Sequence, residues 1–216
     1  MGRKNTNVRK IILSLFRMSS LKLGNIGSLV SFNSESSEMV TKRQVEIVIE
    51  NGNIIDIGHK LGDADSFIDC GNNLVTPGFV DSHTHPVFVD TREDEFEMRI
   101  SGLSYQEIHE RGGGILKSTK LLREASENIL ISKVKSRMDT FLSFGTTTVE
   151  CKSGYGLDTV SELKSLMVID KINKNHEIDM IPTFMGGHDF PSEFQNNKED
   201  YVDLICNKMW GRRKYK

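Results

Sequence analysis

The chain has 216 residues, of which 37% are hydrophobic and 27% are charged, and its formal net charge is −2. This composition is typical of a globular protein and excludes a disordered or fibrous chain. The near-neutral balance gives no reason to expect nucleic acid as a partner, and no apolar run approaches the roughly 20 residues that cross a bilayer. Three scattered cysteines, Cys70, Cys151 and Cys206, favour a reducing compartment over a disulfide framework. We therefore expect a cytoplasmic protein without a membrane segment.

Residues 1–19 form a basic N-terminal extension. The first 34 residues contain six basic residues and no acidic residue before Glu35. An organelle transit peptide has this character, and so does a solvated basic arm. The apolar part, "IILSLF", is short and no small-residue cleavage site follows it, which favours the arm over organelle targeting.

Residues 20–75 carry the signals of a small β-domain. In "QVEIVIENGNIIDIG", Val45, Ile47 and Ile49 alternate with charged residues before the pair Asn51 and Gly52. Alternation followed by Asn-Gly predicts a hairpin with one buried face. Upstream, "LKLGNIGSLVSF" predicts further short strands, followed by a loop rich in Ser and Glu.

From residue 76 the pattern changes to strands that alternate with helices. "GFVDSH" is a candidate strand, and Ser104 with Glu107 forms the capping-box pattern that opens a helix. Apolar residues spaced by three and four predict a helix that ends at Gly145. A strand at 146–151, a second helical pattern, a strand within "DMIPTFMGGH" and a polar segment then follow. The apolar residues of the second helical pattern are Val160, Leu163, Leu166, Met167 and Ile169. This order predicts a parallel sheet or barrel with right-handed crossovers.

Polar side chains follow each of the three predicted strands. His83 and His85 follow the first, Lys152 and Tyr155 the second, and His188 the third. Active sites in such folds lie at the carboxyl ends of the strands. We therefore expect these side chains to meet at one rim.

The pair His83 and His85 is a candidate metal site. Residues i and i+2 of an extended segment point to the same face, so two imidazoles can reach one cation, Zn(II) or Fe(II). A bare H-x-H is more often two histidines in a surface loop. Here it follows an apolar strand and Asp81 in a protein of alternating strands and helices, which favours the metal site.

Three further residues have two interpretations each. Gly154 and Gly156 flank Tyr155 and let the backbone bend sharply enough to bring the phenol into a pocket, although a plain loop has the same composition. His188 is either structural or the third imidazole of the rim. Arg92 is either a solvated charge or a clamp for an anionic group, because guanidinium binds carboxylate bidentately.

Two other motifs favour their simpler interpretation. "RGGGI" at 111–115 lacks the Lys-Ser/Thr that completes a phosphate-binding P-loop, so a flexible loop near the rim is expected. Lys152 suits a carbamylated bridge between two metal ions or an ordinary ion pair, and we favour the ion pair.

Four segments carry a resemblance to a known family: "LVTPGFVDSHTHPVF", "RGGGILKST", "FGTTTVECKSGYGL" and "PTFMGGHDFPSEF". They resemble the metal-dependent amidohydrolase superfamily and, within it, the imidazolonepropionase family. The resemblance extends over roughly residues 20–205. It implies an α/β fold in which a small β-sandwich-like domain at 20–75 precedes the first half of a (β/α)8 TIM barrel at 76–207.

The resemblance also implies a reaction and the residues that perform it. The enzyme would hydrolyse the cyclic amide of 4-imidazolone-5-propanoate to N-formimidoyl-L-glutamate in histidine degradation. His83 and His85 would hold one Zn or Fe ion, which lowers the pKa of bound water towards about 7. Arg92 would bind the propanoate carboxylate. Tyr155 and His188 would contact the ring and help polarise its carbonyl, with His188 as the catalytic residue. A homodimer of the full-length enzyme is left open.

Parts of the family pattern have no counterpart in this sequence. A later metal-binding histidine, a neighbouring acid and a final aspartate are missing, and a barrel of about 250 residues compares with 141 residues at 76–216. The closing "KMWGRRKYK", residues 208–216, is a basic tail that does not resemble the family. We therefore expect a truncated barrel with impaired activity, from a fragment, an isoform or an incompletely predicted gene. A non-catalytic product and a two-metal hydrolase of the hydantoinase or dihydroorotase type are the alternatives.

Overall fold

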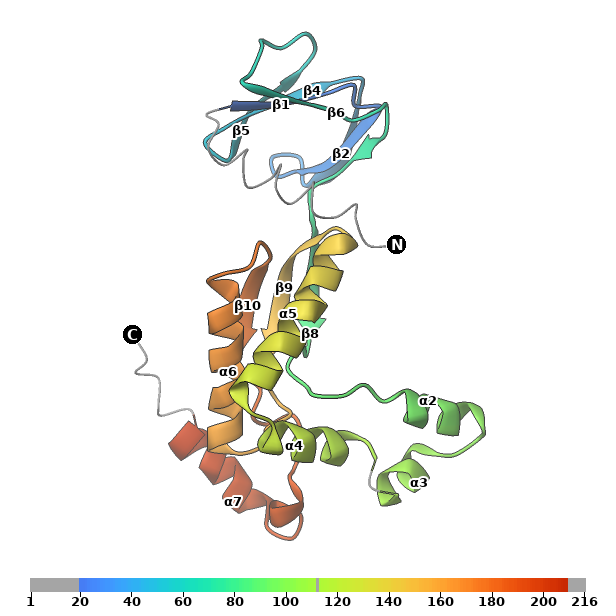
Figure 1. The fold of residues 1–216 in the computed structure, drawn as a ribbon, viewed down its shortest axis with the longest axis vertical. Helices are drawn as coiled ribbons and strands as arrows, with labels where there is room; N and C mark the ends of the chain where they lie inside the picture. Colours follow the sequence, from blue (N-terminus) through green and yellow to red (C-terminus); the bar gives the residue numbers. More distant parts are fainter. Residues whose placement is uncertain (1–19, 112, 210–216) are drawn as a thin grey trace. The chain divides into compact units, whose positions relative to one another are not determined.

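The fold is given by a computed structural model that describes residues 20–111 and 113–209, and it divides into two compact units after Pro77 (Figure 1). The basic extension expected at residues 1–19 lies outside the described residues, as does most of the tail at 208–216. No helix in the described ranges is long and apolar enough to span a membrane.

The first unit contains two small β-sheets. The strand order of one is β5-β4-β1-β6 and that of the other is β3-β2-β7. The strands are β1 (Ser20–Gly24), β2 (Ser28–Asn33), β3 (Glu38–Arg43), β4 (Glu46–Glu50), β5 (Asn53–Gly58), β6 (Ser66–Asp69) and β7 (Leu74–Val75). Both sheets contribute to one core, in which Leu29 of β2 and Ile47 of β4 are at most 5% exposed.

The predicted hairpin is confirmed. β4 and β5 pair antiparallel, and Glu50 opposite Asn53 closes a two-residue loop. Asn51 and Gly52 have φ angles of 48° and 78°, which is the left-handed pair that a type I′ turn requires. Ile47 is 3% exposed, so the alternating face is buried as expected.

The second unit is built on a parallel three-stranded sheet with the order β10-β9-β8. Its strands are β8 (Phe79–Thr84), β9 (Thr146–Lys152) and β10 (Asp179–Thr183). Its helices are α2 (Glu93–Ile100), α3 (Tyr105–Glu110), α4 (Ile115–Glu124), α5 (Glu127–Ser143), α6 (Thr159–Asn173), a 3-10 turn η1 (Ser192–Phe194), α7 (Lys198–Asp203) and a π-helical turn η2 (Leu204–Met209). The predicted alternation of strand and helix is confirmed across these three strands.

Helices α5 and α6 lie along the sheet and form the core of this unit with it (Figure 1). Leu130, Val134 and Met138 of α5 are spaced by four residues and are all fully buried. They pack with Val149 of β9 and Met180 of β10, which are also fully buried. The apolar stripe that predicted α5 is therefore the stripe that faces the sheet.

The capping box of α3 and the end of α5 at Gly145 form as the sequence predicts. The Ser104 amide donates to the Glu107 carboxylate at 2.8 Å, and the Glu107 amide donates to Ser104 Oγ at 3.3 Å, which is a complete capping box at α3. Helix α5 begins after Ser126, whose Oγ accepts from the Ile129 amide. It ends before Gly145, which has a φ of 88°.

The first turns of α6 differ from the predicted apolar pattern. Val160 is 76% exposed and Met167 is 49% exposed, although both were expected in the apolar stripe. Polar residues lie on the buried side instead: Ser161, Glu162 and Ser165 are at most 4% exposed. The helix was predicted correctly, but the face it buries near its start is polar, and this polar face lies behind the candidate site.

Candidate active site

Four of the predicted site residues gather at the carboxyl ends of the parallel strands. His83 lies in β8 and His85 just beyond it, whereas Tyr155 and His188 lie in the segments that follow β9 and β10. The ring centroids of His85 and His188 are 4.4 Å apart, and the two ring planes are nearly parallel. Tyr155 lies 5.2 Å from His85 and 5.4 Å from His188, and His83 lies 5.6 Å from His85. We call these four side chains the ring cluster.

Backbone carbonyls orient two imidazoles of the ring cluster. Nδ1 of His85 is 2.8 Å from the Ser153 oxygen, and Nδ1 of His188 is 3.0 Å from the Gly154 oxygen. A carbonyl oxygen only accepts, so each Nδ1 carries a proton and each neutral ring keeps its free lone pair on Nε2. Burial, followed by the nearby His188, lowers the pKa of His85 to about 4. His85 is therefore a neutral imidazole at pH 7 with Nε2 free to bind a cation.

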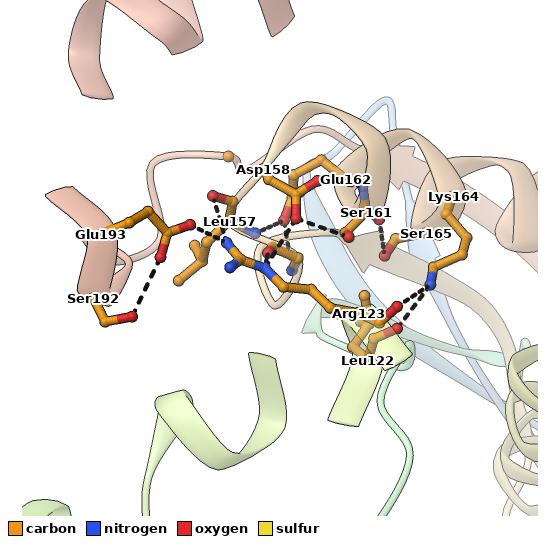
Figure 2. Close-up of polar contacts among 12 residues, drawn as sticks. Leu122, Arg123, Leu157, Asp158, Ser161, Glu162, Lys164, Ser165, Ser192 and Glu193 are labelled. Atoms are coloured by element: carbon orange, nitrogen blue, oxygen red, sulfur yellow. Dashed lines mark hydrogen bonds and ion pairs between the residues drawn. The ribbon is translucent and has the colours of Figure 1, made fainter. Parts of the chain in front are cut away.

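The segment that carries Tyr155 is held by a carboxylate on one side and a guanidinium on the other. Glu162 accepts from the amides of Gly154, Gly156 and Leu157 at 2.8–2.9 Å. Arg123 Nε donates to the Gly156 oxygen at 2.8 Å. Arg123 Nη2 donates to the Leu157 oxygen at 3.1 Å (Figure 2). We call this the Glu162–Arg123 frame. It satisfies backbone groups that would otherwise be buried without partners.

The two glycines beside Tyr155 are needed for different reasons. Gly154 has a φ of +111°, and a Cβ there would lie 2.8 Å from the His188 Cβ, so this position needs glycine for its backbone and for space. A Cβ on Gly156 would lie 2.7 Å from the Glu162 nitrogen. The expected sharp bend is therefore found at Gly154, whereas Gly156 permits the close approach of the segment to α6.

The imidazoles of His83 and His85 are donors of the type that zinc and iron bind. His85 has the geometry that metal-binding histidines usually show, with the other ring nitrogen donating to a backbone carbonyl. Within residues 20–111 and 113–209, no group of three or more His, Cys, Asp or Glu side chains could hold a metal ion. The described residues thus supply two suitable imidazoles, compared with the three protein ligands of a typical catalytic zinc.

Lys152 forms the ion pair that its sequence context favoured. Its Nζ lies 2.6 Å from Glu150 Oε1, and its side chain is 13% exposed. The hydrogen bond from Lys152, with a second one from Thr183, lowers the pKa of Glu150. An ammonium that pairs with a carboxylate suits this geometry, whereas a negatively charged carbamate beside Glu150 would be repelled.

Arg92 is not brought to the ring cluster. It precedes α2, its side chain is 40% exposed, and its Nη1 lies 3.6 Å from Glu95 Oε2. In the described part of the chain, no contact joins Arg92 to the four rings.

The glycine-rich segment is packed rather than open where the structure describes it. Gly113 and Gly114 are buried, and the Gly114 amide donates to Glu95 Oε1 at 2.8 Å. A Cβ on Gly113 would lie 2.9 Å from the Ile108 oxygen. Close packing against Glu95 and Ile108 explains these two glycines without the flexibility expected from the sequence.

Three charged residues that support the site were not recognised from the sequence: Arg123, Arg137 and Glu162. Arg137 of α5 donates to the carbonyls of Pro86 and Phe88, and its guanidinium carbon lies 3.4 Å from the Phe88 ring centroid. The only available signal was position, because Arg137 adjoins the buried Met138 and Glu162 follows the helix-capping Asp158 by four residues. Charges on the sheet-facing side of a helix are candidates for buried hydrogen bonding.

One solved structure is similar to this chain in fold. A mutant of atrazine chlorohydrolase TrzN from Arthrobacter aurescens TC1, complexed with zinc and atraton, matches with a TM-score of 0.51 at 14% identity. The match covers 76% of this chain and 35% of that protein. At this identity the likeness is one of fold alone, a mixed α/β architecture.

Sequence comparison makes the relationship more specific. The chain is 40% identical over 195 residues to the imidazolonepropionase of Herpetosiphon aurantiacus and 42% identical over 185 residues to that of Clostridium tetani. It is 48% identical over 152 residues to that of Syntrophobacter fumaroxidans. These matches cover 86%, 82% and 70% of this chain, and 46%, 44% and 36% of the respective relatives. No family model matches.

By these identities the chain is a relative of the imidazolonepropionases, and it spans about half the length of the curated relatives that it matches. The family resemblance predicted from the four segments is confirmed.

Proposed function

We propose that this chain carries part of the active site of a metal-dependent hydrolase that opens the cyclic amide of 4-imidazolone-5-propanoate to give N-formimidoyl-L-glutamate. The observation that carries the proposal is the ring cluster, in which the ring centroids of Tyr155, His85 and His188 lie at most 5.4 Å from one another. Its support in sequence is the identity of 40–48% to imidazolonepropionases. In the reaction, water adds across the amide: the C–N bond breaks, the carbon gains the hydroxyl and the nitrogen gains the proton.

His83 and His85 would hold the metal ion, Zn or Fe. When bound, such an ion supplies activated water at neutral pH and polarises a carbonyl. The fixed tautomer of His85 supports this role, because its Nδ1–H is committed to the Ser153 carbonyl and Nε2 is left as the donor atom.

Tyr155 and His188 would bind the flat heterocycle. With Nδ1 donating to the Gly154 carbonyl, neutral His188 presents Nε2 as an acceptor, which suits a ring N–H of the substrate. Donating to the substrate carbonyl would need the doubly protonated imidazolium. Tyr155 has a phenol O–H that can donate instead. We therefore assign ring recognition to both residues.

Arg92 would bind the propanoate carboxylate. Its present partner is Glu95 at 3.6 Å, which is a long, partly exposed contact and therefore a weak one. A substrate carboxylate that accepts from two guanidinium nitrogens would replace this contact with a stronger, bidentate one.

The test is ligand binding and turnover by the 216-residue chain with Zn(II) or Fe(II) added. Titration calorimetry measures binding of imidazolonepropanoate, and the appearance of N-formimidoylglutamate measures turnover. We expect Arg92→Ala to weaken binding by about 10- to 100-fold, the loss of one charge-assisted hydrogen-bonding group. Arg99→Ala removes the same charge from an exposed position of the same helix and should leave binding unchanged. Absence of binding at millimolar ligand, or equal binding by both variants, would contradict the proposal.

The chief alternative within enzymes is a two-metal cyclic-amide hydrolase with Lys152 carbamylated. The 2.6 Å ion pair between Lys152 and Glu150 argues against it. Mass spectrometry of the intact chain decides the matter: a carbamate on Lys152 together with hydantoin or dihydroorotate turnover would favour the alternative. A chain that binds neither metal nor ligand would favour a non-catalytic product.

A further inference from the structure

A buried carboxylate lies behind the ring cluster without belonging to it. Glu162 is 1% exposed, although it stands in the first turn of α6, where acidic residues usually face solvent. Its two oxygens accept three hydrogen bonds, from the amides of Gly154, Gly156 and Leu157. All three donors belong to the segment that carries Tyr155. The side chain is therefore committed to the shape of one loop.

We infer that Glu162 is a positioning residue for the candidate active site: its carboxylate fixes the backbone that orients His85, His188 and Tyr155. The inference rests on the proposed function only in assuming that these rings bind metal and substrate. Their orientation by Glu162 is a property of the chain itself.

The link from Glu162 to His188 passes through a single residue. The Gly154 amide donates to Glu162 Oε2 at 2.9 Å, and the Gly154 carbonyl accepts from His188 Nδ1 at 3.0 Å. The preceding carbonyl, that of Ser153, accepts from His85 Nδ1 at 2.8 Å. Moving the Gly154 peptide would therefore disturb the acceptors of both imidazoles.

Crowding around Gly154 makes the link stiff. Its α-carbon already approaches His188 so closely that an added Cβ would lie 2.8 Å from the His188 Cβ and 2.9 Å from the Met185 oxygen. Leu157, at the other end of the loop, is fully buried with a φ of 53°. A leucine keeps this left-handed backbone only where its surroundings hold it. Here Glu162 binds its amide and Arg123 binds its carbonyl.

Arg123 extends the frame to the segment after β10. It forms ion pairs with Asp158 at 2.9 Å and with Glu193 at 2.8 Å (Figure 2). Glu193 lies five residues beyond His188, so Arg123 ties both loops of the ring cluster to α4. The carboxylate and the guanidinium thus hold opposite sides of the Tyr155 loop, and each bonds groups that the other does not.

The substitution Glu162→Gln tests the inference with almost no change of size. The amide nitrogen of glutamine donates and does not accept, so it opposes at least one of the three loop N–H groups. We expect the Gly154 peptide to shift and the imidazoles of His85 and His188 to lose their uniform Nδ1–H form.

The measurement is the pair of ring ¹⁵N chemical shifts of each histidine in the metal-free 216-residue chain, at about pH 8, where an ordinary imidazole is neutral. In the unaltered chain, His85 and His188 should be Nδ1–H tautomers. In Glu162→Gln, both should shift towards a mixture with the Nε2–H form. His176 serves as the internal reference, because its Nδ1 accepts from the Ile178 amide and it should remain Nε2–H in both chains.

The control is Ile172→Val, which removes one methyl from a 4% exposed residue of the same helix and loses stability without touching the loop. It should leave all three histidine spectra unchanged. If Glu162→Gln does not fold, Glu162→Asp keeps the charge but withdraws it by one methylene, and the same shifts are expected.

Folded variants of Glu162 whose His85 and His188 shifts equal those of the unaltered chain would overturn the inference. So would an unaltered chain in which these two rings are not Nδ1–H. Because the readout needs neither metal nor substrate, its result is independent of imidazolonepropanoate binding. A chain with the expected shifts that fails to bind the ligand would contradict the proposed function alone.

Discussion

Replacing Gly154 with alanine tests whether the site depends on a single close contact between two loops. The position has a φ of +111°, and the new Cβ would lie 2.8 Å from the His188 Cβ, 2.9 Å from the Met185 oxygen and 3.2 Å from the His188 Cγ. Real Cβ atoms essentially never lie within 3.0 Å of such atoms, as the first two distances would require, so either the Tyr155 loop or the His188 loop must move. The substitution therefore couples stability to the geometry of the ring cluster.

The cost has two parts that a second glycine separates. An L-residue in the left-handed region costs about 1–2 kcal/mol, and forcing an extra carbon into a filled space adds about 1–3 kcal/mol. Gly102 has a φ of +94° and would have no atom within 4 Å of an added Cβ. We therefore expect Gly102→Ala to lose about 1–2 kcal/mol of unfolding free energy and Gly154→Ala about 2–5 kcal/mol.

Urea unfolding followed by circular dichroism measures both variants. With a slope of roughly 2 kcal/mol per molar urea, the midpoint of Gly154→Ala should lie about 0.5–1.5 M below that of Gly102→Ala. The ring ¹⁵N shifts of His188 should change in the first variant and not in the second. Equal midpoints, together with an unchanged His188 spectrum in both variants, would show that the loops do not meet as described.

Two further predictions concern the core of the second unit. Burial raises the pKa of Cys151 to about 12, so this thiol stays protonated at about pH 8. A thiol reagent should label exposed Cys206 in the native chain and reach Cys151 only on unfolding. Equal labelling rates would contradict this burial. Met138→Ala empties a fully buried position and should cost about 2–5 kcal/mol, whereas Ile129→Ala, at a 47% exposed position of the same helix, should cost less than about 1 kcal/mol; urea midpoints that fall equally would contradict the assignment of the buried face.

Local rules predicted those parts of the fold that depend on neighbouring residues. The turn at Asn51 and Gly52 and the capping box of Ser104 with Glu107 involve residues one to three positions apart, and both form as expected. The apolar spacing that predicts α5 is equally local and the helix forms as expected. Leu130, Val134 and Met138 pack in the core with the sheet, whereas Ile129 is 47% exposed.

Helix α6 shows where the same rule fails. Its apolar residues predicted the helix but not the face, since Val160 is exposed while Glu162 is buried. Glu162 is buried because three loop amides donate to its carboxylate. Hydrophobic spacing cannot predict such a residue, because backbone amides are the same at every position and leave no signal in the sequence.

The candidate site likewise contains residues that the sequence placed correctly and one that it did not place. The strand-end rule placed His83, His85, Tyr155 and His188 together, because parallel strands bring their carboxyl ends to one edge regardless of what the loops do. Arg92 precedes α2, and the rule gives no information about its distance from the rings. Its observed partner is Glu95, and its proposed partner is a ligand.

The orientation of each imidazole decides whether its Nε2 donates or accepts a hydrogen bond, which the position of the ring alone does not decide. An imidazole can donate or accept at Nε2, and which it does is decided by the partner of Nδ1. For His188 that partner is the carbonyl of Gly154, 34 residues earlier, and the Gly154 amide is in turn fixed by Glu162, eight residues later. The resemblance suggested that His188 polarises a carbonyl, whereas this bond makes the neutral ring an acceptor. Whether His188 donates to the substrate or accepts from it is thus set by a backbone group that Glu162 holds in place, which is why a residue that touches no ring can control the chemistry of one.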